Sequence, residues 1–378
     1  MDFSYSEEQQ GLRQLTAQMF DDRVTDEFRR DFSRSGELFD RVLWQALADA
    51  GVLGTAIAEE HGGSGLGFTE ICLALEEQGR VLAPVPLLAT LVLGALPVQK
   101  FGTPAQRAAW LPRVASGEAL LTAALEEAGS GDPLVPAVKA TAAGHGWRLL
   151  GVKGCVPYGA QADAILVTAR TGRKCVRVFI VDPHAKGITV EARSTTSGEP
   201  QAQVTFTNAM VSAADELGVP PQGEGIVQWM VERGHLALAA QQVGLTAEAL
   251  RRTTAYAAGR VQFGRPTGSF QAVQHRLADA FIDVEALRSV YLRALWALES
   301  EVPAAADVAV AKWWAARAGH RVTHSAQHLH GGLGADIDFP IHAYLLHARQ
   351  IEQSLGGATP MLARIGAQIA AGAVSPLT

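Results

Sequence analysis

The chain is poor in the residues that mark several protein classes. It has three cysteines among 378 residues, Cys72, Cys155 and Cys175, and no CxxC pair. Such spacing argues against a disulfide framework or a thiolate zinc site and fits a reducing cytoplasm, so we expect no metal centre. The formal net charge is −6, without the basic excess that a nucleic-acid-binding protein shows.

Long apolar runs are also missing. The longest, around LLATLVLGALPV, is too short and too interrupted to span a bilayer. The first residues, MDFSYSEEQQ, are polar and acidic, which is unlike a signal peptide. These features predict a cytoplasmic protein without a membrane span.

What is present predicts several domains with a large core. The apolar fraction is 48% and the charged fraction 19%, and the length favours two or three domains. Residues 1–120 show apolar residues at helical spacing, as in FDRVLWQALADAGVLG. Residues 121–222 contain short β-branched runs, such as AILVTAR and VRVFIVD, bounded by turn residues. Residues 223–378 are alanine-rich, with four long helical stretches.

The pattern therefore predicts an α+β protein. We expect an N-terminal helical domain (1–120), a central antiparallel β-barrel or sandwich (121–222) and a C-terminal four-helix bundle (223–378). Several stretches carry a more specific signal: SEEQQGLR, EEHGGSG, GRVQFGRPTGSFQAVQHRLAD and QHLHGGLG. Their order and spacing resemble the acyl-CoA dehydrogenase family along nearly the whole chain.

The resemblance implies an oxidoreductase that binds FAD and an acyl-CoA thioester. In that family a glutamate removes the α-proton, the β-hydrogen leaves as hydride to the flavin, and electron-transfer flavoprotein or a similar acceptor takes the electrons. The basic side chains Arg251, Arg252 and Lys312 are candidate contacts for the CoA diphosphate by charge alone.

Residues that reach a neighbouring subunit's flavin are largely retained. An arginine supplies a permanent charge and a forked donor for diphosphate oxygens, and glycines let the backbone approach closely. His328 stands where the family commonly has glutamine, with Gln327 just before it. The resemblance assigns this role to Arg260, Phe263, Gln271, His328, Gly331, Gly332 and Gly334.

Residues that hold the chain's own flavin are mostly replaced. Gly129 and Ser130 survive in LEEAGSGD and remain candidates for a phosphate contact. Leu125 replaces a hydroxyl residue, Cys155 replaces an aromatic that stacks on the flavin, and Pro157 replaces a second hydroxyl residue.

The catalytic glutamate is missing from both places where the family carries it. Gly356 occupies the usual position, and Gly234 occupies the alternative one on the long helix. Glu352 and His235 are the remaining candidates for a base, whereas Glu232 is rotated about 200° from Gly234 around a helix and is expected to point away.

This asymmetry predicts the base-lacking partner of a heteromer. The resemblance extends to α2β2 acyl-CoA dehydrogenases that act on bulky CoA esters, including steroid side chains, and a homodimer or homotetramer stays open. Two alternatives also stay open: a two-component flavin monooxygenase of the same fold, which needs no carboxylate base, and a scaffold subunit without catalysis.

Overall fold

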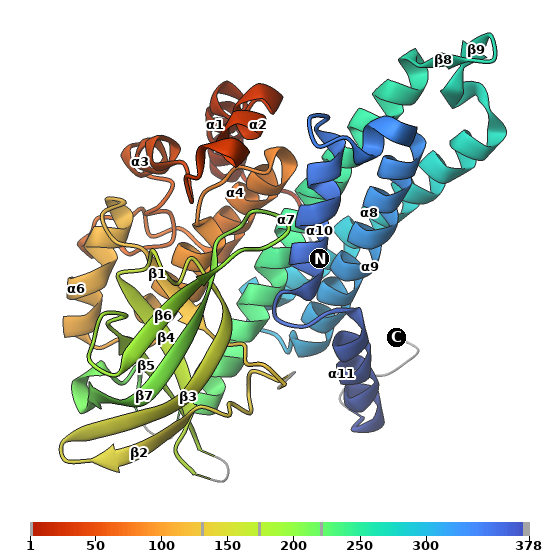
Figure 1. The fold of residues 1–378 in the computed structure, drawn as a ribbon. Helices are drawn as coiled ribbons and strands as arrows, with labels where there is room; N and C mark the ends of the chain where they lie inside the picture. The colour runs from red at the N-terminus through yellow and green to blue at the C-terminus, as the bar shows by residue number, and fades with distance from the viewer. Residues whose placement is uncertain (1–2, 130–131, 173–174, 220–221, 373–378) are drawn as a thin grey trace. The chain divides into compact units, whose positions relative to one another are not determined.

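The protein is described by a computed structural model that covers residues 3–129, 132–172, 175–219 and 222–372. It forms two compact units that interleave along the sequence (Figure 1). The first unit comprises Met1–Glu37, Cys72–Ala83 and His235–Thr378, and the second comprises Leu38–Ile71 and Pro84–Gly234.

Helices dominate both ends of the sequence. Side-chain caps define where several of them begin: Ser6 and Gln9 form a capping box at the first helix, and Thr103 and Gln106 form another. The N-terminal helical elements are α1 (Glu7–Arg23), α2 (Asp26–Ser35), α3 (Arg41–Asp49), η1 (Glu59–His61), α4 (Phe68–Val81), the π-helix η2 (Leu88–Ala95), α5 (Leu96–Phe101) and α6 (Pro104–Ala115). After the sheet come η3 (Ala213–Asp215), α7 (Gly223–Gly259), η4 (Thr267–Ser269), α8 (Gln271–Glu299), α9 (Ala305–Leu329), η5 (Gly331–Ala335), α10 (Ile341–Gln353) and α11 (Ala358–Ala370).

Glycines allow two helices of the first unit to touch through their backbones. A Cβ at Gly244 of α7 would lie 1.8 Å from the Glu76 carbonyl oxygen of α4. A Cβ at Gly79 of α4 would lie 2.1 Å from the Gln241 carbonyl oxygen of α7. Because real Cβ atoms cannot approach so closely, these contacts require glycine.

Ion pairs add α1 and α8 to this helical unit. Glu76 is buried, and its Oε1 accepts hydrogen bonds from Arg13 at 2.9 Å and from Arg288 at 3.0 Å. Glu77 accepts a bond from Arg13 Nε at 2.8 Å. Buried carboxylates are therefore matched by guanidinium groups from two other helices.

The second unit holds a seven-stranded sheet with the order β1-β4-β2-β3-β7-β6, and β5 beside β4. Its strands are β1 (Leu121–Ala124), β2 (Lys139–Ala143), β3 (Gly146–Pro157), β4 (Ala164–Arg170), β5 (Val176–Val181), β6 (Ile188–Arg193) and β7 (Gln201–Ser212). The first unit carries a two-stranded hairpin, β8 (Val261–Gln262) and β9 (Arg265–Pro266).

The expected order of helices, β-domain and helical bundle is confirmed, with one correction to the strand pairing. The sheet is mixed rather than antiparallel, because β4 runs parallel to both β1 and β2. The short strands LTAA and KATAA are rich in alanine, a poor strand former, so their sequences carried little signal. The division at residues 120 and 222 remains a prediction.

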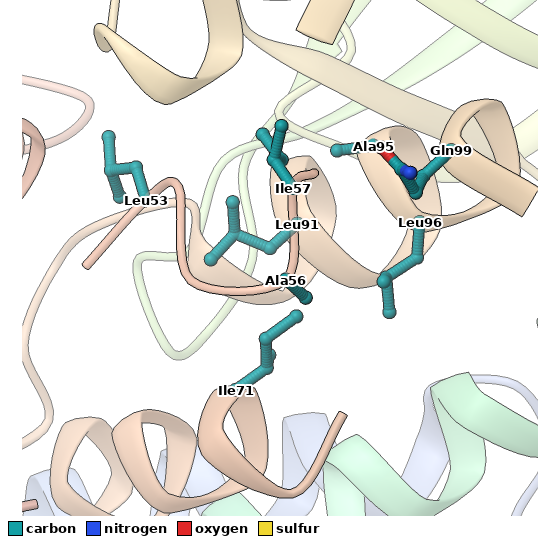
Figure 2. A pocket seen from close by; sticks show the side chains of 8 residues that line it. All are labelled: Leu53, Ala56, Ile57, Ile71, Leu91, Ala95, Leu96 and Gln99. Carbon is teal, nitrogen blue, oxygen red and sulfur yellow. The ribbon is translucent and has the colours of Figure 1, made fainter. Parts of the chain in front are cut away.

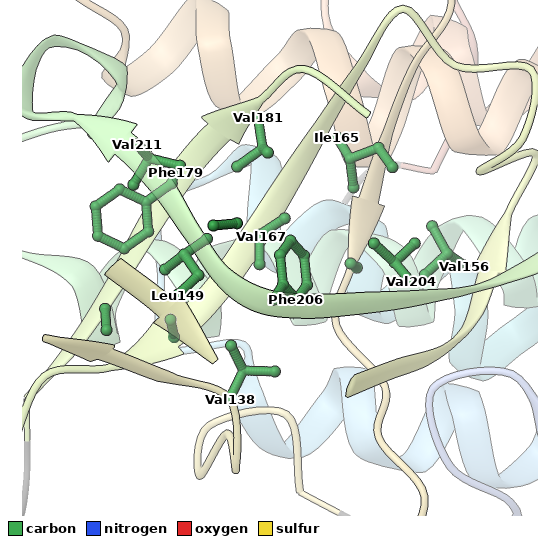
Figure 3. Packing of buried hydrophobic residues seen from close by; sticks show 14 of the residues in the cluster. Val138, Leu149, Val156, Ile165, Val167, Phe179, Val181, Val204, Phe206 and Val211 are labelled. Carbon is green, nitrogen blue, oxygen red and sulfur yellow. The ribbon is translucent and has the colours of Figure 1, made fainter. Parts of the chain in front are cut away.

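One face of the sheet packs a continuous apolar core. On β7 the buried positions alternate through Ala202, Val204 and Phe206, then resume at Ala209 and Val211. A register shift against β3 between Leu149 and Leu150 accompanies this change of phase. Figure 3 shows the resulting cluster, in which Phe179 and Phe206 pack among side chains of β3, β4 and β5.

Candidate functional site

A two-residue turn carries Phe263, one of the residues expected to reach a neighbouring subunit's flavin. Phe263 and Gly264, between β8 and β9, both have positive φ, +53° and +78°. This is the pattern of a type I′ hairpin turn, where glycine is comfortable and a bulky residue is strained. The Phe263 side chain is 94% exposed. An aromatic held in strained backbone and directed into solvent is suited to contact a ligand or another subunit.

Arg260 lies at the base of the same hairpin and is exposed. Its backbone N–H donates to the Tyr256 carbonyl oxygen at 2.8 Å, and its own carbonyl oxygen accepts from Thr267 N–H at 2.7 Å. Across the described ranges its guanidinium has no ion-pair or hydrogen-bond partner. A fixed backbone with an uncommitted guanidinium fits the recognition of a diphosphate.

The other expected contacts to a neighbouring cofactor are also exposed. Gln271 begins α8 and His328 lies in the last turn of α9. A Cβ at Gly331, where φ is +62°, or at Gly332 would meet no atom within 4 Å. At both glycines the backbone is therefore open to an incoming group.

Gly334 has a different, internal role. It is buried, and a Cβ there would lie 2.2 Å from the Gln327 carbonyl oxygen. The Gln327 side chain donates to the Gly334 carbonyl oxygen at 3.0 Å. Gln327 is therefore occupied in holding the glycine turn, and the exposed His328 is the side chain left to reach a ligand.

The structure joins these two segments through a contact that sequence reasoning missed. The rings of Tyr256 on α7 and His330, just after α9, stack with centroids 4.3 Å apart. The signal was present, because His330 immediately precedes the glycine turn and Tyr256 lies four residues before Arg260. Neither spacing shows by itself that the rings meet.

The segments that would cradle the chain's own flavin ring also come together, within the second unit. Gly154 N–H donates to the Glu126 carbonyl oxygen at 3.0 Å, which places the end of β1 beside β3. Leu125 is buried and Cys155 is exposed, with φ at +50°. Partial burial, with a contribution from Glu126, raises the pKa of the Cys155 thiol.

These residues do not supply what a flavin ring needs. Leu125 has no hydroxyl, Cys155 has no aromatic plane, and Pro157 has no backbone N–H. The Pro157 carbonyl oxygen already accepts the Thr122 hydroxyl at 2.7 Å. Gly129 is exposed with φ +81°, whereas Ser130 lies outside the described residues. The ring-cradling half of the site therefore does not fit a flavin.

A buried ion pair stabilises this part of the sheet. Lys153 on β3 and Glu127 are 0% and 3% exposed, and Lys153 Nζ lies 2.6 Å from Glu127 Oε1. Burial lowers the pKa of Lys153 to about 8, against the opposing effect of Glu127. Lys153 Nζ also donates to the Thr168 hydroxyl at 2.8 Å. This pair was not predicted from the sequence.

The segment where the resemblance places the catalytic glutamate has an unusual backbone. Leu355 and Gly356 have φ of +56° and +102°. A Cβ at Gly356 would lie 3.3 Å from Met361 Cε. Gly234, on α7, is buried and equally without a carboxylate. The conformation at Gly356 is one that a glutamate adopts only under strain.

His235 is poorly suited to act as a base. It is buried, and its Nε2 donates to the Leu355 carbonyl oxygen at 2.9 Å. Burial, helped by the nearby Lys312 charge, lowers its pKa to about 3. The ring is therefore neutral at physiological pH but takes up a proton only with difficulty, and its contact fixes the Leu355–Gly356 segment.

Glu352 is committed to other groups. Its carboxylate pairs with Arg349 one helical turn away, and the His320 ring lies 4.0 Å from it. The Glu232 side chain accepts a hydrogen bond from Gln228 on its own helix. These contacts argue against either carboxylate serving as the base.

The basic side chains proposed to contact the CoA diphosphate already have partners within the protein. Arg251 and Arg252 both pair with Glu248 at 2.7 Å, and Arg252 also pairs with Asp26 at 2.7 Å. Lys312 is fully buried and donates to two carbonyl oxygens at the end of α10, those of residues 351 and 352. Charge alone was therefore a poor guide to a CoA contact.

The second unit contains a small apolar pocket, shown in Figure 2. It lies between the loop at Leu53–Ile57, the start of α4 and the helices η2 and α5, and Gln99 is its polar residue. Its volume is about 190 Å³ including the open mouth. Even with the open solvent at its mouth counted, this space is smaller than ligand pockets, which measure about 300–1,000 Å³, so it is too small for an acyl-CoA.

Within residues 3–129, 132–172, 175–219 and 222–372, no group of three or more His, Cys, Asp or Glu side chains is arranged to hold a metal ion. In the same ranges, no helix has the length and hydropathy required to cross a bilayer.

The chain was then compared with known proteins. Residues 6–118 match the family model "Acyl-CoA dehydrogenase, N-terminal domain", and residues 222–370 match "Acyl-CoA dehydrogenase, C-terminal domain". Acyl-CoA dehydrogenase FadE27 of Mycobacterium tuberculosis is 41% identical, with 98% of this chain and 99% of the relative aligned.

Solved structures agree. A chain of the ChsE4-ChsE5 complex from Mycobacterium tuberculosis superimposes with a TM-score of 0.92 at 41% identity, covering 98% of this chain and 99% of that one. A chain of the Tcur3481-Tcur3483 steroid ACAD, solved as a variant, gives 0.91 at 43% identity with the same coverage. The chain therefore belongs to the acyl-CoA dehydrogenase family of oxidoreductases.

Proposed function

We propose that this chain is the subunit of an FAD-dependent acyl-CoA dehydrogenase that completes a partner's flavin site and lacks a catalytic glutamate of its own. The partner would be a paralogous subunit that carries the base, in an α2β2 assembly. The observation that carries the proposal is the Arg260 guanidinium, which has no partner in the described part of the chain, together with the exposed Phe263.

The contrast between the two halves of the site supports this assignment. Every described residue assigned to a neighbour's flavin is exposed, apart from Gly334, which shapes the turn. The positions that serve the chain's own flavin ring offer no hydroxyl and no aromatic surface, and Gly356 and Gly234 offer no carboxylate. A homodimer of this chain would supply residues for the FAD diphosphate, but its pocket would lack residues that hold the flavin ring and would lack a catalytic base.

The residues present define a role in holding the cofactor. Arg260 would neutralise diphosphate oxygens with forked N–H donors, and Gln271 and His328 would add hydrogen bonds. Gly331 and Gly332 would let the backbone come close, and Phe263 would cover an apolar edge of the partner's site. When bound, FAD accepts the hydride of the dehydrogenation, and the proton would be taken by the partner's glutamate.

The substrate class we propose is a CoA ester with a bulky acyl group, such as a steroid side chain. One similar structure supports it by its description, the Tcur3481-Tcur3483 steroid ACAD. Electron-transfer flavoprotein, or a similar carrier, would accept the electrons. A cytoplasmic location remains part of this proposal.

The test is co-expression of the chain with its base-carrying paralogue. We expect a mixed assembly that retains FAD, whereas Arg260→Ala in this chain should weaken FAD binding at least about 10-fold, the effect of losing a charged hydrogen bond. Arg293→Ala is the matched control, since Arg293 is also exposed but pairs with Asp307 on α9.

The isolated chain provides the second arm. It should not oxidise an acyl-CoA with an artificial electron acceptor, and turnover at ordinary enzyme rates would refute the missing-base assignment. Substrate-dependent oxygen consumption with supplied reduced flavin would instead support a monooxygenase. A mixed assembly that binds neither FAD nor acyl-CoA would support a scaffold.

A further inference from the structure

The end of the helical bundle in the first unit carries a three-ring aromatic cluster between two exposed segments. Tyr256 lies in the last turns of α7, His330 follows α9, and Phe339 precedes α10. The Tyr256 and His330 rings stack at 4.3 Å with an interplanar angle of 25°. Phe339 lies 5.4 Å from His330 and 6.4 Å from Tyr256.

His330 is fixed from two sides. It is 4% exposed, and its Nδ1 donates to the Ala326 carbonyl oxygen at 2.7 Å, one turn back on α9. Gly331 follows immediately in left-handed backbone, so the orientation of the His330 ring is coupled to the start of the glycine turn. Burial lowers the pKa of His330, so the ring stacks on Tyr256 in its neutral form.

Tyr256 is coupled in the same way to the hairpin. Its carbonyl oxygen accepts Arg260 N–H at 2.8 Å, and the next residue, Ala257, accepts the Thr267 hydroxyl at 3.2 Å. Arg260 then binds back to Thr267 N–H, which closes the base of the hairpin. Movement of the Tyr256 turn would therefore move Arg260.

We propose that His330 is a positioning residue: through its stack on Tyr256 it holds the hairpin of Arg260 and the glycine turn at Gly331–Ala335 in one fixed arrangement. The inference rests on the proposed function, because the two segments matter together only if they meet one ligand. That ligand is the diphosphate-containing half of a partner's flavin nucleotide. His330 does not touch the ligand in this proposal and acts through the segments on either side of the stack.

The experiment measures FAD affinity of the co-expressed assembly by absorbance after graded dilution, independent of turnover. His330→Ala should weaken FAD binding about 2- to 12-fold, the range expected for loss of an aromatic stack. His330→Phe keeps the ring but loses the Nδ1 bond, and it should bind FAD within about 2-fold of the unchanged protein.

His347→Ala is the matched control. His347 on α10 makes the same kind of bond, from Nδ1 to the carbonyl oxygen four residues back, at 2.9 Å. It should leave FAD affinity unchanged. If it weakens binding as much as His330→Ala, or if His330→Phe is as damaging as His330→Ala, the stack is not the cause and the inference is wrong.

Arg260→Ala separates this inference from the proposed function. If Arg260→Ala weakens FAD binding and His330→Ala does not, the inference fails while the proposed function stands. If Arg260→Ala also leaves FAD bound, the proposed function fails.

A second measurement uses the isolated chain and applies even where a variant assembles poorly. Hydrogen exchange at residues 260–267 should accelerate in Tyr256→Ala but not in Tyr256→Phe. Equal exchange in both variants would overturn the inference.

Discussion

Removing Glu127 should damage the second unit more than removing Lys153, although the two form one buried pair. When Glu127 is lost, the Thr168 hydroxyl is the one acceptor left to Lys153 among the described residues, in place of a carboxylate. When Lys153 is lost, Glu127 keeps two backbone donors, the N–H groups of Ala137 and Val138. An unpaired buried ammonium is therefore the worse outcome.

The magnitudes follow from this difference. Glu127→Ala should lower the free energy of unfolding by about 3–5 kcal/mol, the usual cost of breaking a buried pair. Lys153→Met should lower it by about 1–3 kcal/mol, since the carboxylate retains hydrogen bonds and methionine fills the space. The double variant should be less destabilised than the sum of the single changes by at least about 1 kcal/mol.

Urea unfolding followed by circular dichroism measures these values. Glu191→Gln is the control, because Glu191 pairs with Arg193 on β6 with both side chains about half exposed. It should cost less than about 1 kcal/mol. The reasoning is refuted if Glu127→Ala costs no more than Glu191→Gln, or if the two changes in the buried pair are simply additive.

Three further outcomes are expected. Because the pKa of His235 is lowered to about 3, the unfolded chain takes up a proton near pH 6.5 and the folded chain does not. The contribution of His235 to the free energy of unfolding is therefore fully present above pH 6.5 and is lost as the pH falls towards 3. His235→Asn should reduce this loss of stability in acid, measured by unfolding at a series of pH values. Gly356→Glu should lower the free energy of unfolding by about 1–3 kcal/mol, because φ there is +102°, and it should not give the isolated chain dehydrogenase activity. Gly244→Ala should cost about 1–3 kcal/mol or more, because its Cβ would overlap the Glu76 carbonyl oxygen, whereas Gly11→Ala on α1, where a Cβ meets nothing within 4 Å, should stabilise by about 0.5–1 kcal/mol.

Each of these has a contrary result. An unchanged acid slope in His235→Asn would mean that another group, such as His347, whose pKa is lowered to about 4, dominates the acid transition. Unimpaired stability of Gly356→Glu would show that the segment relaxes to another backbone conformation. Equal effects of the two glycine substitutions would contradict the close contact between α4 and α7.

The sequence by itself determined the order of helical, β and helical regions and the family, because these rest on local periodicity and on motifs read in register. It also determined that Gly356 and Gly234, the positions where the resemblance places the catalytic glutamate, cannot supply a carboxylate in any fold. Short β-branched runs predicted most strands but did not predict the alanine-rich strands β1 and β2. These two form because β1 finds hydrogen-bonding partners on β4 and β2 finds them on β3.

Only the tertiary structure decided which side chains remain available for chemistry. Arg251 and Arg260 are both exposed arginines, yet Arg251 pairs with Glu248, whereas the Arg260 guanidinium has no partner among the residues that the structure describes. His235 is distant in sequence from Leu355, and His330 is distant in sequence from Tyr256. Residue spacing therefore could not predict these contacts, which follow from packing. The physical reason is that periodicity reports which face of an element is buried, whereas charge pairing, ring stacking and pKa shifts depend on the neighbours that folding brings to that face.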